Sequence, residues 1–168
     1  QLHWKSRMAI EKLDHYSVRT TMVERSVDFY ETVLGLRKGP RPPFNFPGAW
    51  LYRSNENGEI VGPSGVHIVG INTQGNAGLS DYLGDKPMSQ QTGSGALDHI
   101  AFTAANIADM HARLAKHGIK YRERKVPAMD LHQIFVEDPD GVTIELNYPR
   151  PEDIAAGARN ILSTKPHG

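Results

Sequence analysis

The chain has 168 residues, with 19 basic and 19 acidic side chains and no cysteine. This length is enough for one domain, or for two closely packed half-domains, with a hydrophobic core. The balanced charge argues against nucleic acid as a partner, and the missing cysteines exclude disulfides and thiolate metal sites. No apolar run approaches the length of a membrane span and no signal-peptide pattern is present, so we expect a cytoplasmic protein without a membrane partner.

The first predicted strand places two polar side chains on one face. Residues 1–8 precede it and are interpreted as an N-terminal extension without a role. Residues 12–20 alternate with the period of two that is typical of a half-buried strand, so His15 and Arg19 are expected to face one cavity. Arg19 is a candidate for binding a substrate anion, because a guanidinium grips a carboxylate with two hydrogen bonds. An ordinary surface ion pair is an equally good explanation of Arg19.

A helix and three short strands are expected next. Thr21 and Glu24 have the spacing of a capping box, which predicts a helix over residues 22–34. The following strands are predicted over residues 36–41, 49–53 and 65–71.

The loop between the first two of these strands is rich in proline and apolar. It carries Phe44 and Phe46, and Trp50 lies just beyond it. Loops near sites often carry function, so we expect these three rings to line a pocket for an aromatic or otherwise hydrophobic substrate. Packing, or protection of a sheet edge, is the plainer alternative.

The second half of the chain repeats this plan. Residues 97–103 alternate like the first strand, and Asn106 is in position to cap a helix that Gly118 ends. Three further strands are predicted over residues 119–126, 131–137 and 142–147. The order of elements is therefore β-α-β-β-β, written twice.

Four regions follow from this pattern. They are a first module, a polar and glycine-rich connector, a second module, and a C-terminal tail or short helix, over residues 9–72, 73–95, 96–148 and 149–168. The sequence thus predicts an α+β fold in which two tandem βαβββ modules form a curved mixed sheet around a metal-binding cleft.

The cleft is predicted from a repeated motif. Leu13-Asp14-His15 recurs 84 positions later as Leu97-Asp98-His99, and a repeat of long period indicates a duplicated structural unit. Each copy also has an ionisable residue on its last strand, His67 or Glu145. One histidine on a strand is more often a packed core residue than a ligand. Here, however, four residues that can bind a metal occupy equivalent places in the two copies. From this pattern, a shared metal site is as strong a hypothesis as packing. The four residues are His15, His67, His99 and Glu145.

The residue types narrow the choice of metal. Imidazole and carboxylate suit one divalent ion of Zn, Ni, Mn, Co or Fe(II), which can polarise a carbonyl or enolate oxygen as a Lewis acid. Among the other histidines, His132 opens a strand that leads into a tight turn and is a candidate acid or base facing the cleft. His111 and His117 are expected on the solvent side of their helix.

Two stretches carry a family resemblance. SVDFYETVLGL (residues 26–36) and FVEDPDGVTIEL (residues 135–146) are similar to sequences of the vicinal oxygen chelate superfamily, and the second is especially close to glyoxalase I. This superfamily includes glyoxalase I, methylmalonyl-CoA epimerase, fosfomycin-resistance transferases, extradiol dioxygenases and bleomycin-resistance proteins. The resemblance covers about residues 10–148. It implies paired βαβββ modules, a U-shaped cleft and a divalent metal that is chelated by vicinal oxygens of the substrate.

The resemblance also implies roles for the four candidate ligands. His15 and His99 match the ligands on the first strands, and Glu145 matches the ligand on the last strand. His67 takes the place of a glutamate in bacterial glyoxalase I, where that residue is both a ligand and the base in proton transfer. His67 is therefore expected as a ligand, as a base, or as both.

Departures from the family patterns bear on the substrate. Arg19 matches an arginine that glyoxalase I uses for glutathione, but Ile71 replaces an asparagine that contacts glutathione, which disfavours a glutathione hemithioacetal. Catechol-cleaving dioxygenases carry a tyrosine where this chain has Phe135 and a histidine where it has Val126. Catechol cleavage by the usual residues is therefore not supported, and Phe135 is expected as a substrate contact.

The leading hypothesis is a divalent-metal-dependent enzyme of the glyoxalase-like lyase or isomerase type, which binds a small oxygenated organic molecule through two oxygens. One alternative is an Fe(II)-dependent ring-cleaving or other dioxygenase. The other is a non-catalytic binding protein of the bleomycin-resistance type, although those proteins lack such ligands. Related proteins are often dimers with modules paired within or between chains, and the sequence leaves a homodimer open.

Overall fold

The computed structural model describes residues 13–72, 74–85, 87, 91–95, 97, 99–126 and 130–164. The predicted N-terminal extension, residues 1–8, lies outside these residues. The predicted α+β fold of two βαβββ modules is confirmed. The first module contains β1 (Tyr16–Thr20), α1 (Val23–Thr32), β2 (Arg37–Gly39), β3 (Gly48–Ser54) and β4 (Ile60–Gly70). The second contains β5 (Ile100–Thr103), α3 (Ile107–Lys116), β6 (Tyr121–Val126), β7 (Leu131–Glu137) and β8 (Thr143–Tyr148).

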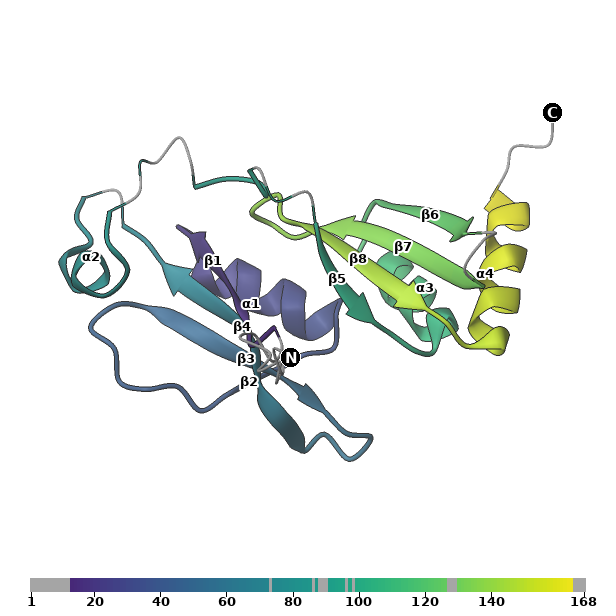
Figure 1. Cartoon of the computed structure of the whole chain (residues 1–168), viewed down its shortest axis with the longest axis horizontal. Helices are drawn as coiled ribbons and strands as arrows, with labels where there is room; N and C mark the ends of the chain where they lie inside the picture. The colour runs from purple at the N-terminus through teal and green to yellow at the C-terminus, as the bar shows by residue number, and fades with distance from the viewer. Residues whose placement is uncertain are drawn as a thin grey trace, which may run out of the picture.

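Each module forms a four-stranded mixed sheet of its own. The strand orders are β1-β4-β3-β2 and β5-β8-β7-β6, so the two sheets have the same topology. In both, the first strand pairs in parallel with the last, and the other pairs are antiparallel. The two sheets lie next to each other along the long axis of the molecule (Figure 1). The ligands predicted on β4 and on β8 therefore belong to different sheets.

Two further helices extend the modules. Helix α2 (Ala77–Leu83) lies in the predicted connector, where no helix was predicted, and α4 (Pro151–Thr164) is the short helix predicted for the tail. Among the described residues, none of the helices combines the length and the hydropathy that a membrane-spanning helix requires.

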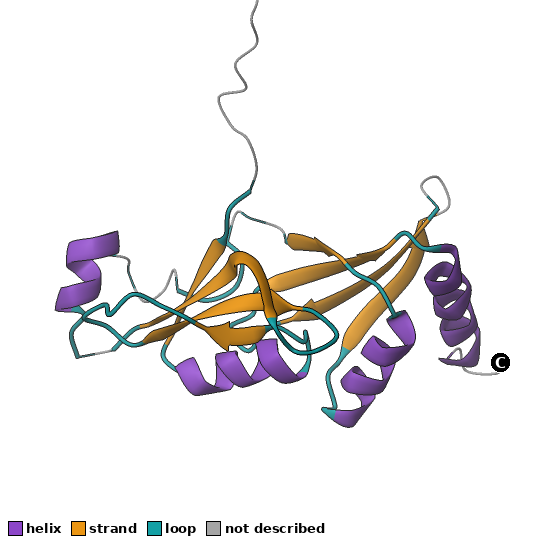
Figure 2. Ribbon diagram, turned by 90° about the horizontal axis from the view of Figure 1, so that it is seen from below, coloured by secondary structure: helices purple, strands orange, loops and turns teal. Residues whose placement is uncertain are grey.

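The main helices cover one side of the two sheets. Figure 2 shows α1 and α3 on the same side of the strands. Because side chains alternate along a strand, every second residue faces these helices. Those residues include Val18, Ile68, Ile134 and Leu146, all of which are buried. The remaining residues form the opposite face, here called the open face.

One hydrophobic core runs through both modules and includes residues of both sheets and of α1 and α3. Polar contacts join the modules at the edge of this core. The Tyr30 hydroxyl donates to Asp138 Oδ2 at 2.8 Å, and the Ser26 hydroxyl donates to Asp140 Oδ2 at 2.7 Å. Helix α1 is thereby fixed to the turn between β7 and β8, which sets the position of one sheet relative to the other.

Local signals explain where the helices begin and end. The predicted capping box is wrong: the N-cap residue is Met22, one residue after Thr21, and it makes no side-chain capping bond. The helix therefore begins one residue later than the capping-box spacing of Thr21 and Glu24 predicts. In α3 the predicted cap is confirmed, since the Asn106 side chain accepts a hydrogen bond from the Asp109 N–H. Gly118 has a φ of 61°, the left-handed conformation that favours glycine after a helix.

Candidate functional site

The open faces of the two sheets carry the predicted ligands at equivalent positions. Strand pairing across the first sheet aligns Ser17, His67 and Trp50 in one row. Strand pairing across the second sheet aligns Ala101, Glu145, Phe135 and Arg122 in the corresponding row. Each row thus places a potential metal ligand on the last strand and an aromatic ring on the third strand.

The first pair of candidate ligands is His15, just before β1, and His67 on β4. Their rings are stacked, with centroids 3.7 Å apart and an interplanar angle of 20°. Trp50 stacks on the other face of the His67 ring, with ring centroids 4.2 Å apart and an interplanar angle of 4°. His67 Nε2 lies 2.8 Å from the Ser64 hydroxyl, and His15 Nδ1 contacts the Asp14 carboxylate. These contacts fix the orientation of both imidazoles.

The surroundings of His67 favour its neutral form. Burial, together with the nearby His15 and Arg41, lowers the pKa of His67 to about 4, although Asp14 partly opposes this shift. An imidazole must be neutral to bind a metal ion. His67 is therefore in its ligand-competent form near neutral pH.

The second pair is His99, just before β5, and Glu145 on β8. His99 Nε2 lies 3.7 Å from Glu145 Oε2. Glu145 is only 8% exposed, and each carboxylate oxygen accepts an amide hydrogen bond: Oε1 from Gln133 at 2.8 Å and Oε2 from Asn147 at 3.0 Å. A buried carboxylate needs such partners, and here they also fix its orientation.

The four predicted ligands thus form two pairs. No group of three His, Asp or Glu side chains in the described residues is arranged to hold a metal ion. Within one chain the two pairs belong to different sheets, so the shared metal site stays a prediction, and the sequence left open whether the modules pair within or between chains.

Comparison with known proteins identifies the family. A model described as the Glyoxalase/Bleomycin resistance protein/Dioxygenase superfamily matches residues 12–146. The chain belongs to this superfamily. A lactoylglutathione lyase of Escherichia coli O157:H7 is 29% identical over 140 residues, which cover 80% of this chain and 90% of that protein. "Glyoxylase I 4" of Arabidopsis thaliana is 29% identical over 141 residues, which cover 82% of this chain and 70% of that protein.

Solved structures of the superfamily support the fold. A glyoxalase family protein from Bacillus anthracis matches this structure with a TM-score of 0.59 at 23% sequence identity, and the match covers 86% of this chain and 99% of that chain. Helix α4 follows the residues that match the superfamily model.

The predicted substrate contacts lie beside the two pairs. Phe44, Phe46 and Trp50 line a cavity of about 50 Å³ together with His15 and His67. On the second sheet, Phe135 meets the His99 ring edge-on, with centroids 6.2 Å apart. The guanidinium of Arg19 donates to the Gly84 carbonyl oxygen at 3.1 Å, and its role as an anion anchor remains a prediction.

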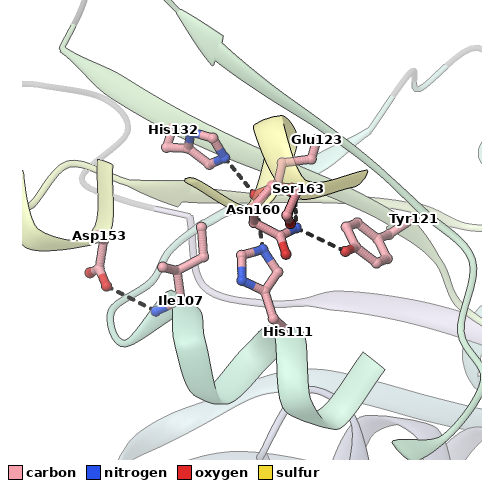
Figure 3. Close-up of polar contacts among 8 residues, drawn as sticks. All are labelled: Ile107, His111, Tyr121, Glu123, His132, Asp153, Asn160 and Ser163. Atoms are coloured by element: carbon pink, nitrogen blue, oxygen red, sulfur yellow. Dashed lines mark hydrogen bonds and ion pairs between the residues drawn. The ribbon is translucent and has the colours of Figure 1, made fainter. Parts of the chain in front are cut away.

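His132 does not face the cleft as predicted. It lies on the helix-facing side of β7 with no exposed surface, so the prediction that it faces the cleft is wrong. Its Nε2 is 2.7 Å from Glu123 Oε1, which also lies 2.8 Å from His111 Nε2 (Figure 3). The Asn160 amide of α4 donates to the other carboxylate oxygen at 2.7 Å. The expectation that His111 faces solvent is likewise corrected, because its side chain is only 16% exposed.

Replacing Glu123 with Gln should destabilise the protein by about 2 kcal/mol, because an amide cannot accept from both imidazoles and from Asn160 as a carboxylate does. Urea denaturation measures this change. The exposed Glu137→Gln serves as the matched control and should change stability by less than about 0.5 kcal/mol. A Glu123→Gln variant as stable as the wild type would contradict a structural role for the His111, Glu123 and His132 cluster.

Sequence reasoning did not find several residues of the site. Gln133 shares the open face with Glu145 only because of the strand register, and strand alternation within one segment does not give that register. Ser64 contacts His67 across an irregular part of β4, where the pairing with β3 shifts. Arg41 reaches His67 through the folding of a loop, for which the sequence has no periodic signal.

Proposed function

We propose that this protein is a divalent-metal-dependent lyase or isomerase that binds a small oxygenated molecule through two oxygens. The ligands would be His15, His67, His99 and Glu145. The observation that carries the proposal is their occurrence as two oriented pairs at equivalent positions of the duplicated module. Packing requirements alone do not explain why the same arrangement occurs in both modules.

The chemistry of the donors fits such an ion. Neighbouring donors around an ion with bonds of about 2.1 Å lie roughly 3 to 3.5 Å apart. The 3.7 Å between His99 Nε2 and Glu145 Oε2 is close to this range. When two imidazoles are stacked, one ring nitrogen of each can point toward the same metal ion. The stacked rings of His15 and His67 would bind the ion in this way. When bound, the metal would supply Lewis-acid stabilisation of charge on a substrate oxygen.

A second copy of the chain would complete the site. Each pair has too few donors for a stable site, and the two pairs of one chain lie on different sheets. In a symmetric homodimer, the first-module pair of one chain can meet the second-module pair of its partner, which gives two equivalent sites. We therefore propose that the active form is a homodimer.

The contacts of His67 favour a role as ligand over a role as mobile base. Both faces of its ring are covered, and its Nε2 is held by Ser64. The amides of Gln133 and Asn147 would orient Glu145 in the same way, and groups that orient ligands commonly affect metal affinity.

Metal analysis tests this function. Protein purified without added metal should contain about one transition-metal ion per chain, and Glu145→Ala or His99→Ala should lower that content by more than about tenfold. Chelator-treated protein should lose any isomerase or lyase activity and regain it with Zn, Ni, Co, Mn or Fe(II). Equal metal content in the wild type and both variants would refute the proposal. Oxygen uptake with substrate and iron would indicate a dioxygenase instead.

A further inference from the structure

A charged side chain outside the predicted site lies directly beside the first ligand pair. Arg41 follows β2, in the loop that carries Phe44 and Phe46. The carbon atom of its guanidinium is 5.0 Å from the centroid of each of these rings. One N–H donates to the Phe46 carbonyl oxygen at 2.9 Å. Arg41 also lines the cavity that contains His15 and His67.

The loop holds Arg41 in place. Prolines at both ends limit the backbone. A Cβ atom at Gly48 would lie 2.3 Å from the Ile68 carbonyl oxygen and 3.1 Å from Arg41 Nη2, so this close approach requires glycine. The guanidinium is thus positioned before any ligand arrives, which lowers the entropy that binding costs.

Among the described residues, Arg41 has no acidic partner, since no Asp or Glu forms an ion pair with it. It is half-buried, and burial lowers its pKa. A partly desolvated cation without a counter-ion is unfavourable, and a bound anion would relieve this cost. Most of its N–H groups are not used by the contact with Phe46.

The cavity limits what the anion can be. Its volume of about 50 Å³ is room for roughly three or four water molecules, so it can hold a carboxylate group but not a ring. A ring attached to that carboxylate would have to lie at the mouth of the cavity, against half-buried Phe44 and Trp50, whose centroids are 6.2 Å apart. Aromatic rings at such separations pack favourably.

The second sheet contains a similar unit. The carbon atom of the Arg122 guanidinium lies 4.4 Å from the centroid of Phe135, which in turn meets the His99 ring. An arginine over an aromatic side chain therefore accompanies both ligand pairs. This repetition argues against chance packing of Arg41 alone.

We propose that Arg41, Phe44 and Trp50 form a subsite for an aromatic carboxylate, in which the carboxylate binds the guanidinium and the ring packs on the aromatic side chains. The assignment of this subsite to the substrate rests on the proposed function. It names the substrate class as a small aromatic acid that also carries the oxygens for the metal.

Binding of simple probes to the 168-residue chain tests the subsite. Chelator-treated wild type, Arg41→Gln, Arg41→Lys and Arg37→Gln are titrated with benzoate by calorimetry, and each variant is checked for an unchanged melting temperature. Benzamide tests the charge, and cyclohexanecarboxylate tests the ring. Arg37 is an exposed arginine on the neighbouring β2 and is the matched control.

Arg41→Gln should weaken benzoate binding by at least about tenfold, and Arg41→Lys by less, because lysine keeps the charge but loses the planar fork. Arg37→Gln should bind benzoate like the wild type, and benzamide should bind the wild type at least about tenfold more weakly than benzoate. Unchanged benzoate binding by Arg41→Gln, or equal affinity for benzoate and benzamide, would overturn the subsite. These titrations need no metal, so they test the subsite separately from the proposed function. If benzoate binding depends on Arg41 but the protein never binds metal, the proposed function is refuted and the subsite is not.

Discussion

Mixing two inactive variants should restore about a quarter of the wild-type metal content and activity. One variant, His15→Ala with His67→Ala, lacks the first-module pair. The other, His99→Ala with Glu145→Ala, lacks the second-module pair. Each variant alone should bind no metal, since every site in its homodimer has lost two ligands.

The expected recovery follows from symmetry. If each site takes one pair from each chain, a mixed dimer has one site with all four ligands and one site with none. Random pairing produces mixed dimers for about half of the population, so about a quarter of all sites are intact. Two tags on co-expressed chains allow the mixed dimer to be isolated, and it should then contain about one metal ion per dimer.

The same experiment separates the two arrangements of modules that the sequence left open. If both pairs of a single chain formed the site, neither variant would contribute an intact site and mixing would restore nothing. A wild-type protein that contains metal, combined with no recovery on mixing, would therefore contradict the proposed dimer but not the ligand assignment. Size-exclusion chromatography of each variant provides the control, because both must still form dimers.

The duplicated module was predictable because its signals are local. Alternating residues gave the strands, and the repeated Leu-Asp-His motif placed His15 and His99 at equivalent positions. The predicted strand over residues 131–137 coincides with β7, whereas the helix over residues 77–83 was missed because the connector around it, residues 73–95, is polar and glycine-rich as a whole. The arrangement of one module against the other could not be predicted, since it depends on contacts such as Tyr30 with Asp138, which are 108 residues apart.

The error at His132 has a similar cause. A histidine at the start of a strand can face either side, and a shift of one residue in register reverses the face. The pairing of Gln133 with Asn147 settles this register, and it turns His132 toward the helices and Gln133 toward Glu145. The partner of His132 is Glu123 on the neighbouring strand, but no pattern within either segment indicated that contact.

Replacing Asp138 with Ala should lower the free energy of unfolding by about 3 kcal/mol, a large effect for a residue outside the site. Asp138 is 4% exposed and accepts three hydrogen bonds: from the Tyr30 hydroxyl and from the backbone N–H groups of Asp140 and Val142. Alanine would leave these donors without their acceptor at the junction of the two modules. Asp138→Asn keeps one acceptor oxygen for the turn and should cost less.

A double-mutant cycle with Tyr30→Phe isolates the contact between modules. If the Tyr30 and Asp138 side chains stabilise each other, the two substitutions together should cost less than the sum of their separate effects. The pH dependence gives a second check, because burial raises the pKa of Asp138. Its folded form then binds a proton more tightly than its unfolded form, so this contribution to stability is fully present in acid and is lost as pH rises through the folded pKa. The penalty of Asp138→Ala, measured by urea denaturation, should therefore grow from about pH 7 toward about pH 4. A penalty that becomes smaller from about pH 7 to about pH 4 would contradict this prediction. It would show that folding stabilises the ionised carboxylate of Asp138, because the hydrogen bond from Tyr30 lowers its pKa more than burial raises it.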